Sequence, residues 1–467
     1  MAEVFADATE SLCPVCLKRI AATRQPRGDD VFLVKECAEH GLFSTVIWRG
    51  APALSEWRRA KAPVHIGQRM VAEGCPFDCG LCTAHEQRPC SVLLEVTNRC
   101  NLHCAVCFAD SGNGEEDEPT LEGIAGLLEG AMAAAGPCNL QLSGGEPTLR
   151  DDLPAIVEMA RRIGYSFIQV NTNGLRLAAD QSYADRLKAA GLSSVFLQFD
   201  GVEDGIYRAL RGRPLLEQKL RAVRNSGEAG LGVVLVPTLV KGVNTDSVGA
   251  LVRQALQLAP TVRGIHFQPF SQFGRFPGNS AQRRFTLPEV MRSLEEQTGG
   301  VLKLGDFSPP GGEHAHCSFH ATYISSADGS LRPIGGAEED ACCSAEADGI
   351  GRTVETVSRR WQLPLPARPA DRPAVAGKAG CCGGARPAMT RNENPLTLDD
   401  FLRDVATRSF TISGMAFQDA ENLDLERLRG CCIAVVSPEG RLVPFCAYNL
   451  TGRNGDSLYR RRNGADR

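Results

Sequence analysis

The sequence predicts an α/β protein in which parallel strands and crossover helices form an open sheet or a partial or full barrel, with cysteine-rich regions at both ends of the chain. Two observations support this prediction. In the middle of the chain, short apolar runs rich in β-branched and aromatic residues alternate with amphipathic stretches. Of the 19 cysteines, only Cys138 lies between residues 108 and 316. The middle is therefore the scaffold, and the ends are expected to hold metal.

The alternating segments define the expected elements. The expected strands are Ser91–Thr97, Asn139–Leu142, Ser166–Asn171, Ser194–Phe199, Gly232–Val240 and Gly264–Phe270. The expected helices are Leu121–Ala135, Leu153–Ile163, Ala184–Ala190, Leu216–Ser226 and Val248–Leu258. Capping-box spacing marks helix starts at Thr148 with Asp151 and at Thr286 with Glu289. In parallel α/β folds the chemistry lies at the carboxyl ends of the strands, so the loops that follow them are the places to search.

Length and charge narrow the classes of protein. With 467 residues, we expect three parts: a metal-binding region over 1–90, the scaffold over 91–300 and a region over 301–467 with a loose insertion at about 335–395. The net charge of -4 argues against a nucleic-acid partner. The sequence has no apolar run of about 18 residues and no signal peptide, so we expect no transmembrane segment and a cytoplasmic protein. In a reducing compartment, clustered cysteines indicate metal ligands.

Three cysteines follow the first predicted strand. Cys100, Cys104 and Cys107 form a C-x3-C-x2-C loop. Thiolate is the preferred ligand of iron–sulfur clusters, and three thiolates on a four-iron cluster leave one iron open for chemistry. Zinc binding or a chance pattern are the alternatives for this loop taken alone.

A glycine-containing turn follows the second predicted strand. Its residues are Ser143, Gly144, Gly145 and Glu146, followed by proline. Adjacent glycines allow the backbone to come close to a ligand, and the glutamate offers an acceptor for an ammonium group. A plain βα turn is the alternative for this motif in isolation.

Together, at the ends of the first two strands of one α/β domain, the two motifs resemble the radical S-adenosylmethionine (SAM) superfamily over about 91–300. The resemblance implies a partial or full radical SAM barrel and a [4Fe–4S] cluster on the three loop cysteines, with SAM on the open iron. It implies SAM contacts from the turn and from later strand ends, namely Ser143, Gly144, Gly145, Glu146, Asn173, Gln198, Asp200 and Arg211. A surface arginine is the alternative for Arg211. Val106 replaces the family's usual aromatic residue, which weakens the packing expected around the adenine.

A second C-x3-C-x2-C loop lies upstream. It contains Cys75, Cys79 and Cys82, and Cys90 follows as a fourth thiol. Four thiolates complete the ligand set of a [4Fe–4S] cluster, so we expect an auxiliary cluster here. A second SAM-cleaving cluster is the alternative.

The first metal-binding pattern of the chain comes earlier still. Cys13 and Cys16 form a knuckle, and Cys37 and His40 supply a second pair of ligands. This spacing suits a mononuclear iron or zinc ion. A surface role for His40, with a later cysteine as fourth ligand, is the alternative.

The C-terminal cysteines bracket a predicted hairpin. Cys431 and Cys432 precede it, Cys446 follows it, and Cys317 precedes a similar segment. This arrangement resembles the auxiliary-cluster extensions of radical SAM enzymes, which implies a further [4Fe–4S] cluster on these residues. The cysteines at 342 and 343 are alternates.

Taken over nearly the whole chain, the sequence is most similar to the class D radical SAM methylases of methanopterin-type cofactors and to the tetraether lipid synthases. The resemblance implies an enzyme that cleaves SAM reductively to a 5′-deoxyadenosyl radical and functionalises an unactivated C–H bond, with methylation or C–C bond formation favoured. One or two auxiliary clusters and a low-potential electron donor of the ferredoxin or flavodoxin type are implied as well. The sequence does not identify the catalytic residues.

Several alternatives stay open at the level of sequence. A small molecule, a lipid and a peptide all stay open as the substrate. The sequence does not reveal whether the site is an apolar tunnel or a polar pocket. A peptide- or protein-modifying enzyme and a sulfur-inserting enzyme are the alternative radical SAM functions. A multi-cluster electron carrier or a metal-sensing protein is the non-enzymatic alternative, and it predicts no binding of SAM.

Overall fold

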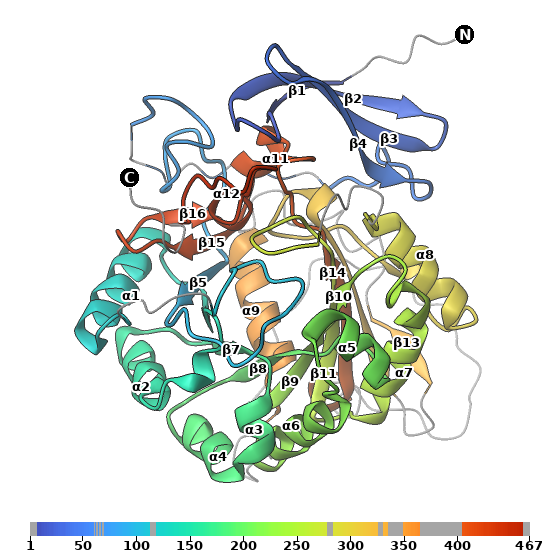
Figure 1. The fold of residues 1–467 in the computed structure, drawn as a ribbon. Helices are drawn as coiled ribbons and strands as arrows, with labels where there is room; N and C mark the ends of the chain where they lie inside the picture. The colour runs from blue at the N-terminus through green and yellow to red at the C-terminus, as the bar shows by residue number, and fades with distance from the viewer. Residues whose placement is uncertain are drawn as a thin grey trace, which may run out of the picture.

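The computed structural model describes residues 7–112 except for seven positions between 60 and 69, together with 118–277, 284–325, 330–334, 349–364 and 404–460. Two sheets organise these residues (Figure 1). A four-stranded antiparallel sheet near the N-terminus lies beside a twelve-stranded sheet that curves around the centre of the molecule. The predicted α/β fold, a partial barrel with cysteine-containing extensions, is confirmed.

Parallel strands form most of the large sheet. In spatial order they are β15 (Ile433–Val436), β5 (Ser91–Glu95), β6 (Asn139–Ser143), β7 (Ile168–Thr172), β8 (Ser194–Gln198), β9 (Gly232–Val236), β11 (Val262–Pro269) and β14 (Ser409–Met415). Antiparallel strands form its edges: β16 (Leu442–Pro444) beside β15, and β12 (Ser318–Ser325) with β13 (Leu331–Pro333) beside β14. The short strand β10 (Thr238–Leu239) pairs with β11. In the described part of the chain the two edges do not pair, so the barrel is partial.

The strands predicted from the sequence are confirmed, and strands from the C-terminal region complete the sheet. Strand β14 pairs in parallel with β11, and β15 pairs in parallel with β5. The predicted hairpin near the C-terminus is β15 with β16. The division into 1–90, 91–300 and 301–467 stays a prediction.

Helices cover the outer face of the parallel strands (Figure 1). They are α1 (Leu121–Ala135), α2 (Leu153–Ile163), α3 (Leu175–Ala179), α4 (Gln181–Ala189), α5 (Asp204–Arg211), α6 (Leu216–Glu228), α7 (Val248–Gln257) and α8 (Leu287–Gln297). In α2, for example, Ile156, Val157 and Ala160 are buried at helical spacing against the sheet. The predicted helices are confirmed.

One of the two predicted helix starts is wrong. The capping box of Thr286 with Glu289 is present at the start of α8. Helix α2, however, begins after Asp152, and the hydroxyl of Thr148 donates to Glu146 instead of capping a helix. The buried carboxylate of Glu146 competes for this hydroxyl, which spacing alone does not reveal.

The range of about 335–395, predicted to be a loose insertion, requires a correction because it contains helix α9 (Gly349–Trp361). The helix lies in the middle of the barrel (Figure 1) and contacts β9, β11 and β14. Asn139, the first residue of β6, donates to Val354 O at 3.4 Å, and Arg263 Nε, near the start of β11, donates to a carbonyl oxygen of α9 at 3.2 Å. Helix α9 therefore closes the end of the barrel at which the strands begin. The proline- and glycine-rich stretch that follows obscures this short helix in the sequence.

The four-stranded sheet consists of β1 (Asp7–Leu12), β2 (Arg19–Arg27), β3 (Asp30–Cys37) and β4 (Gly41–Arg49), and we call it the N-terminal ribbon. It packs against the segment that leads from β14 to α11 (Leu425–Arg429). Arg24 Nε donates to Asp424 Oδ2 at 2.8 Å, and Lys35 Nζ donates to Ala420 O at 2.7 Å. All four of these residues are buried, so the ribbon is joined to the C-terminal region through a polar interface with little access to water.

We predict that Asp424→Asn lowers the free energy of unfolding at pH 7 by about 2–3 kcal/mol, because it removes the buried carboxylate partner of Arg24, which still pairs with Asp7 and Glu426. Burial alone would raise the pKa of Asp424, but the hydrogen bond and charge of Arg24 outweigh burial and hold this pKa below its usual value. Such a carboxyl adds stability that is complete at neutral pH and is lost as the pH falls from about 4 through the folded-state pKa. Denaturant unfolding at pH 7 and pH 3 should thus show a steeper acid loss in wild type than in the variant, and equal losses would contradict the assignment.

Candidate functional site

The loop after β5 brings Cys100, Cys104 and Cys107 to one cavity, and their thiols are free. The loop is held mainly through its backbone. Arg275 Nε donates to Cys104 O at 2.8 Å, and Arg275 and Cys107 exchange two backbone hydrogen bonds of 2.9 Å. Three sulfurs on one loop, facing one cavity, are a donor set that fits an iron–sulfur cluster.

The glycine turn after β6 packs directly on the strand-to-loop junction that precedes these cysteines. Gly145 N donates to Thr97 O and Glu146 N donates to Arg99 O, both at 2.8 Å. A Cβ atom on Gly144 would lie 2.1 Å from Thr97 O, and one on Gly145 would lie 2.3 Å from Arg99 O. Gly144 also has φ +136°, which side chains rarely adopt. Both positions therefore require glycine, and the turn and the cysteine loop form one unit.

The carboxylate of Glu146, predicted from the sequence as an acceptor for an ammonium group, is occupied by protein donors. One oxygen accepts from the amide of Thr148 at 3.1 Å and from the hydroxyls of Thr148 and Thr172 at 2.5 and 2.6 Å. The other accepts from the amide of Asn173 at 2.7 Å. With 1% of its surface exposed, Glu146 connects the glycine turn to the end of β7.

Arg211, predicted as a contact for a carboxylate of the ligand, already has one within the protein. Its Nε and Nη2 donate to the two oxygens of Asp200 at 2.7 and 2.8 Å, a bidentate pair. Nη2 also donates to Thr238 at 3.1 Å, and Nη1 donates to Val106 O in the cysteine loop at 3.1 Å. Arg211 is buried, so the surface alternative is wrong, and it holds the cysteine loop against the end of β8.

A single cavity of about 1920 Å³ connects the cysteine loop with the barrel interior. The glycine turn and Arg211 line it near the cysteines, and residues of α9 line it at the closed end of the barrel. Sites for one drug-sized molecule measure about 300–1,000 Å³, so this cavity has room for more than one ligand.

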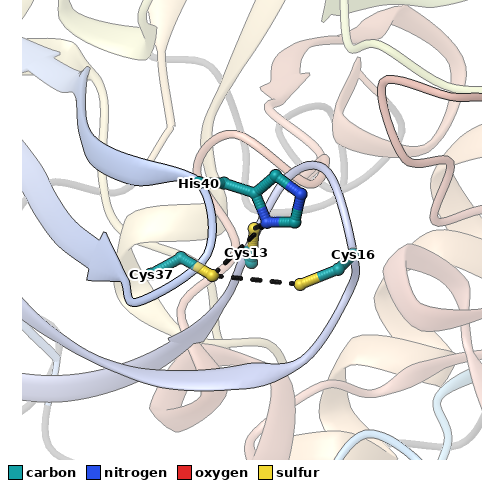
Figure 2. Close-up of side chains that lie close together, drawn as sticks. All are labelled: Cys13, Cys16, Cys37 and His40. Atoms are coloured by element: carbon teal, nitrogen blue, oxygen red, sulfur yellow. Dashed lines mark hydrogen bonds between the residues drawn. The ribbon is translucent and has the colours of Figure 1, made fainter.

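The ligand atoms of Cys13, Cys16, Cys37 and His40 all lie within 4.8 Å of one another in the N-terminal ribbon (Figure 2). The sulfurs of Cys16 and Cys37 are 3.9 Å apart, and His40 Nδ1 lies 3.6 Å from the sulfur of Cys13 and 3.5 Å from that of Cys37. Tetrahedral bonds of about 2.3 Å to sulfur and about 2.05 Å to nitrogen place ligands about 3.8 Å and 3.6 Å apart. The ribbon therefore holds four donors at the spacing that one tetrahedral metal ion requires.

A model of the radical SAM superfamily matches residues 94–255, and a model of the HMPTM N-terminal zinc ribbon domain matches residues 5–49. The chain is 34% identical to 7,8-dihydro-6-hydroxymethylpterin dimethyltransferase of Methanocaldococcus jannaschii, over 95% of this chain and 94% of that protein. The chain belongs to the radical SAM superfamily. It is also 30% identical to GTP 3′,8-cyclase of Chlorobaculum tepidum, over 47% of this chain and 67% of the relative. Among solved structures, Streptococcus suis SuiB bound to precursor peptide SuiA gives a TM-score of 0.39 at 15% identity, with 46% of each chain covered.

These matches confirm the prediction of a radical SAM enzyme and the predicted similarity to the methanopterin-type methylases. When bound, SAM and its [4Fe–4S] cluster supply a 5′-deoxyadenosyl radical that takes hydrogen from an unactivated carbon. Radical SAM enzymes need a reductant and act on small molecules. Within the described residues, every helix is too short or too polar to cross a membrane.

The radical SAM chain has further cysteines that the structure groups differently from the sequence. Cys75, Cys79 and Cys82 line a small pocket together, next to His85. Cys90, expected as their fourth ligand, lines the large cavity instead, and its sulfur lies 3.0 Å from that of Cys432. The parallel pairing of β15 with β5 brings these two residues together just before the two strands begin, and Cys90 N donates to Cys432 O at 2.8 Å. Sequence order alone hides this pairing.

The remaining C-terminal cysteines lie near one another, with Cys446 buried and Cys317 and Cys431 partly buried. Burial raises the pKa of the Cys431 thiol well above its usual value, and the nearby sulfurs of Cys446, Cys317 and Cys90 raise it further. Two donors already point at these sulfurs. Arg427 donates to the sulfur of Cys317 at 3.3 Å, and the amide of residue 418 donates to that of Cys446 at 3.2 Å. The Nε atom of Arg427 is buried without a partner among the described residues, which fits a site for an anionic cluster.

The sequence reasoning missed Lys219, which is fully buried in α6. Its ammonium group donates to Asn173 O at 2.5 Å and to Gln198 Oε1 at 2.9 Å, and so joins the ends of β7 and β8. Burial lowers the pKa of Lys219 to about 7, although Asp200 acts in the opposite direction. A signal existed: Lys219 shares the buried face of α6 with residues 222, 223 and 226, a position where an unpaired lysine is rare.

We predict that Arg211→Lys lowers the rate of 5′-deoxyadenosine formation about tenfold, because lysine cannot make the bidentate pair with Asp200 and reach Val106 O as well. Iron content per chain should fall with the rate. Arg208→Lys is the matched control, since Arg208 lies on the exposed face of the same helix. If both variants keep the wild-type rate and iron content, Arg211 does not hold the cysteine loop.

Proposed function

We propose that this radical SAM enzyme methylates a carbon of a dihydropterin. The observation that carries the proposal is the alignment with the dihydropterin dimethyltransferase over nearly all of both chains, at 34% identity. The cavity supports it, because about 1920 Å³ exceeds what one ligand needs and leaves space beside SAM for a second organic molecule.

The structure suggests two roles for the residues predicted to bind SAM. Glu146, Asp200 and Arg211 are committed to protein partners, so we assign them to positioning. The backbone carbonyls of Gly144 and Gly145 are then the proposed acceptors for the methionine ammonium group. Ser143, Asn173 and Gln198 all line the cavity, and they stay our candidates for direct contacts with SAM.

We propose two auxiliary [4Fe–4S] clusters. One is bound by Cys75, Cys79 and Cys82, which share a pocket. The other is bound by the neighbouring cysteines Cys317, Cys431 and Cys446, with either Cys90 or Cys432 as the fourth thiolate. The donation from Arg427 to Cys317 supports the second cluster, because cationic donors stabilise anionic sulfur.

The remaining cofactor and partners follow from the same chemistry. We propose zinc at Cys13, Cys16, Cys37 and His40, which the match to a zinc ribbon domain supports. We propose that the reductant is a low-potential ferredoxin or flavodoxin and that the enzyme works in the cytoplasm, where free thiols persist.

The decisive experiment is anaerobic assay of the reconstituted enzyme with reductant, SAM and 7,8-dihydro-6-hydroxymethylpterin, with mass spectrometry of the products. We predict 5′-deoxyadenosine and a pterin heavier by one or two methyl groups. Cys104→Ala should abolish both products, since Cys104 belongs to the proposed SAM-cluster ligands. Cys138→Ala is the matched control, because Cys138 is a buried core residue that does not line the cavity. SAM cleavage without any methylated pterin would rule out the pterin substrate.

We predict a different result for Cys446→Ala. This variant should still cleave SAM, because the Cys100 loop is intact, but its methylated product should fall below about a tenth of the wild-type yield. The reason is that loss of one thiolate ligand opens the proposed C-terminal cluster. The ratio of 5′-deoxyadenosine to methylated pterin measures this uncoupling. An unchanged ratio would show that Cys446 holds no cluster needed for the reaction.

A further inference from the structure

Three aromatic rings meet at the closed end of the cavity, and we call them the ring floor: Phe196 of β8, His266 of β11 and Trp361 of α9. The ring centroids of Phe196 and His266 are 5.6 Å apart, those of Phe196 and Trp361 are 5.8 Å apart, and those of His266 and Trp361 are 6.4 Å apart. All three residues also line the cavity, so the cluster has one face open to it.

The ring floor lies within reach of the strand ends proposed to bind SAM. Phe196 precedes Gln198 by two residues on β8, which corresponds to about 7 Å along a strand. A molecule that rests on the ring floor is therefore one layer of side chains below the rim of the barrel. This is the distance at which a second ligand can lie beneath SAM in the same cavity.

Some polar atoms on strands that neighbour the ring floor lack hydrogen-bond partners among the described residues. The buried hydroxyl of Thr411 and the side-chain oxygen of Asn171 both lack a hydrogen bond among the described residues, and both residues line the cavity. His266 Nδ1 shares a hydrogen bond of 2.9 Å with the hydroxyl of Ser413, and Nε2 makes none with the described residues. Burial lowers the pKa of His266 to about 4, so its ring is neutral at pH 7 and offers both donor and acceptor character.

A plain hydrophobic plug does not explain these features. A plug would fill the space above the rings, whereas the cavity extends over them. It would also avoid buried polar atoms without partners, because each costs about 1–3 kcal/mol. Tilted aromatic rings beside polar atoms without partners match a ligand that is itself flat, aromatic and edged with nitrogen and oxygen atoms.

We propose that Phe196, His266 and Trp361 form a subsite that binds the planar ring of a nitrogen heterocycle beneath SAM, with α9 as the element that sets its size. The proposal deepens the proposed function and rests on it for the identity of the heterocycle, a dihydropterin. Helix α9 thus does more than close the barrel, since Trp361 supplies the one ring of the floor that does not come from the sheet.

The test is equilibrium dialysis of 7,8-dihydro-6-hydroxymethylpterin against the reconstituted enzyme with SAM and no reductant. We expect Trp361→Leu and Phe196→Leu each to weaken binding about tenfold or more, and Trp361→Phe, which keeps a ring, to weaken it less than about threefold. Phe307→Leu is the matched control, because Phe307 lines another wall of the cavity and packs on Phe319 at 5.0 Å. Cleavage of SAM in the absence of pterin should stay within about twofold of wild type in every variant that folds.

The outcomes separate this inference from the proposed function. If the wild type binds the pterin and Trp361→Leu binds it as tightly as Phe307→Leu does, the ring floor is overturned and the pterin substrate stands. If the wild type does not bind the pterin, the proposed function fails, and the same variants are then tested with guanine as a heterocycle of similar size. Guanine binding that depends on Trp361 supports the ring floor, and absence of binding to either heterocycle overturns it.

Discussion

The close approach of the Gly144–Gly145 turn to the backbone of Thr97–Arg99 is the constraint on which the site depends. Side chains at either glycine would lie within about 2.3 Å of a carbonyl oxygen, so the two loops approach each other only because side chains are absent. The cysteine loop starts from one of these backbones, and Glu146 ties the other to the end of β7. The position of the cysteine loop relative to the glycine turn is therefore set by backbone contacts.

Buried charges extend this arrangement to β8 and α6. Two carboxylates, Glu146 and Asp200, and two cations, Arg211 and Lys219, are all at least nine-tenths buried. Isolated charges at such depth would be costly, but here each has hydrogen-bond partners at a strand end. Four neighbouring strand ends are thereby held together by polar contacts, and the apolar core below them carries the remaining stability.

The sequence predicts well whatever depends on local periodicity and poorly whatever depends on distant pairing. Each predicted strand of the barrel is present because buried parallel strands are continuous apolar runs. The partnership of Cys90 with Cys432 could not be predicted, since it arises where β15 joins β5 across the sheet. Arg211 and Glu146 have the residue types of ligand contacts, but only the fold shows that protein partners occupy them. Helix α9 was missed because its short amphipathic pattern precedes a long stretch rich in proline and glycine.

The segment that leads from β14 through α11 connects the N-terminal ribbon with the C-terminal cysteines. On one side, Asp424 pairs with Arg24 of the N-terminal ribbon. On the other side, Arg427 donates to the sulfur of Cys317. Arg427 lies three residues after Asp424, which is less than one helical turn. A change in the ribbon that moves Asp424 must therefore move Arg427, and with it the environment of the C-terminal cysteines. None of the ribbon residues 7–49 lines the cavity, so a metal ion bound in the ribbon would affect the site only through this segment, which positions the donors beside the C-terminal cysteines.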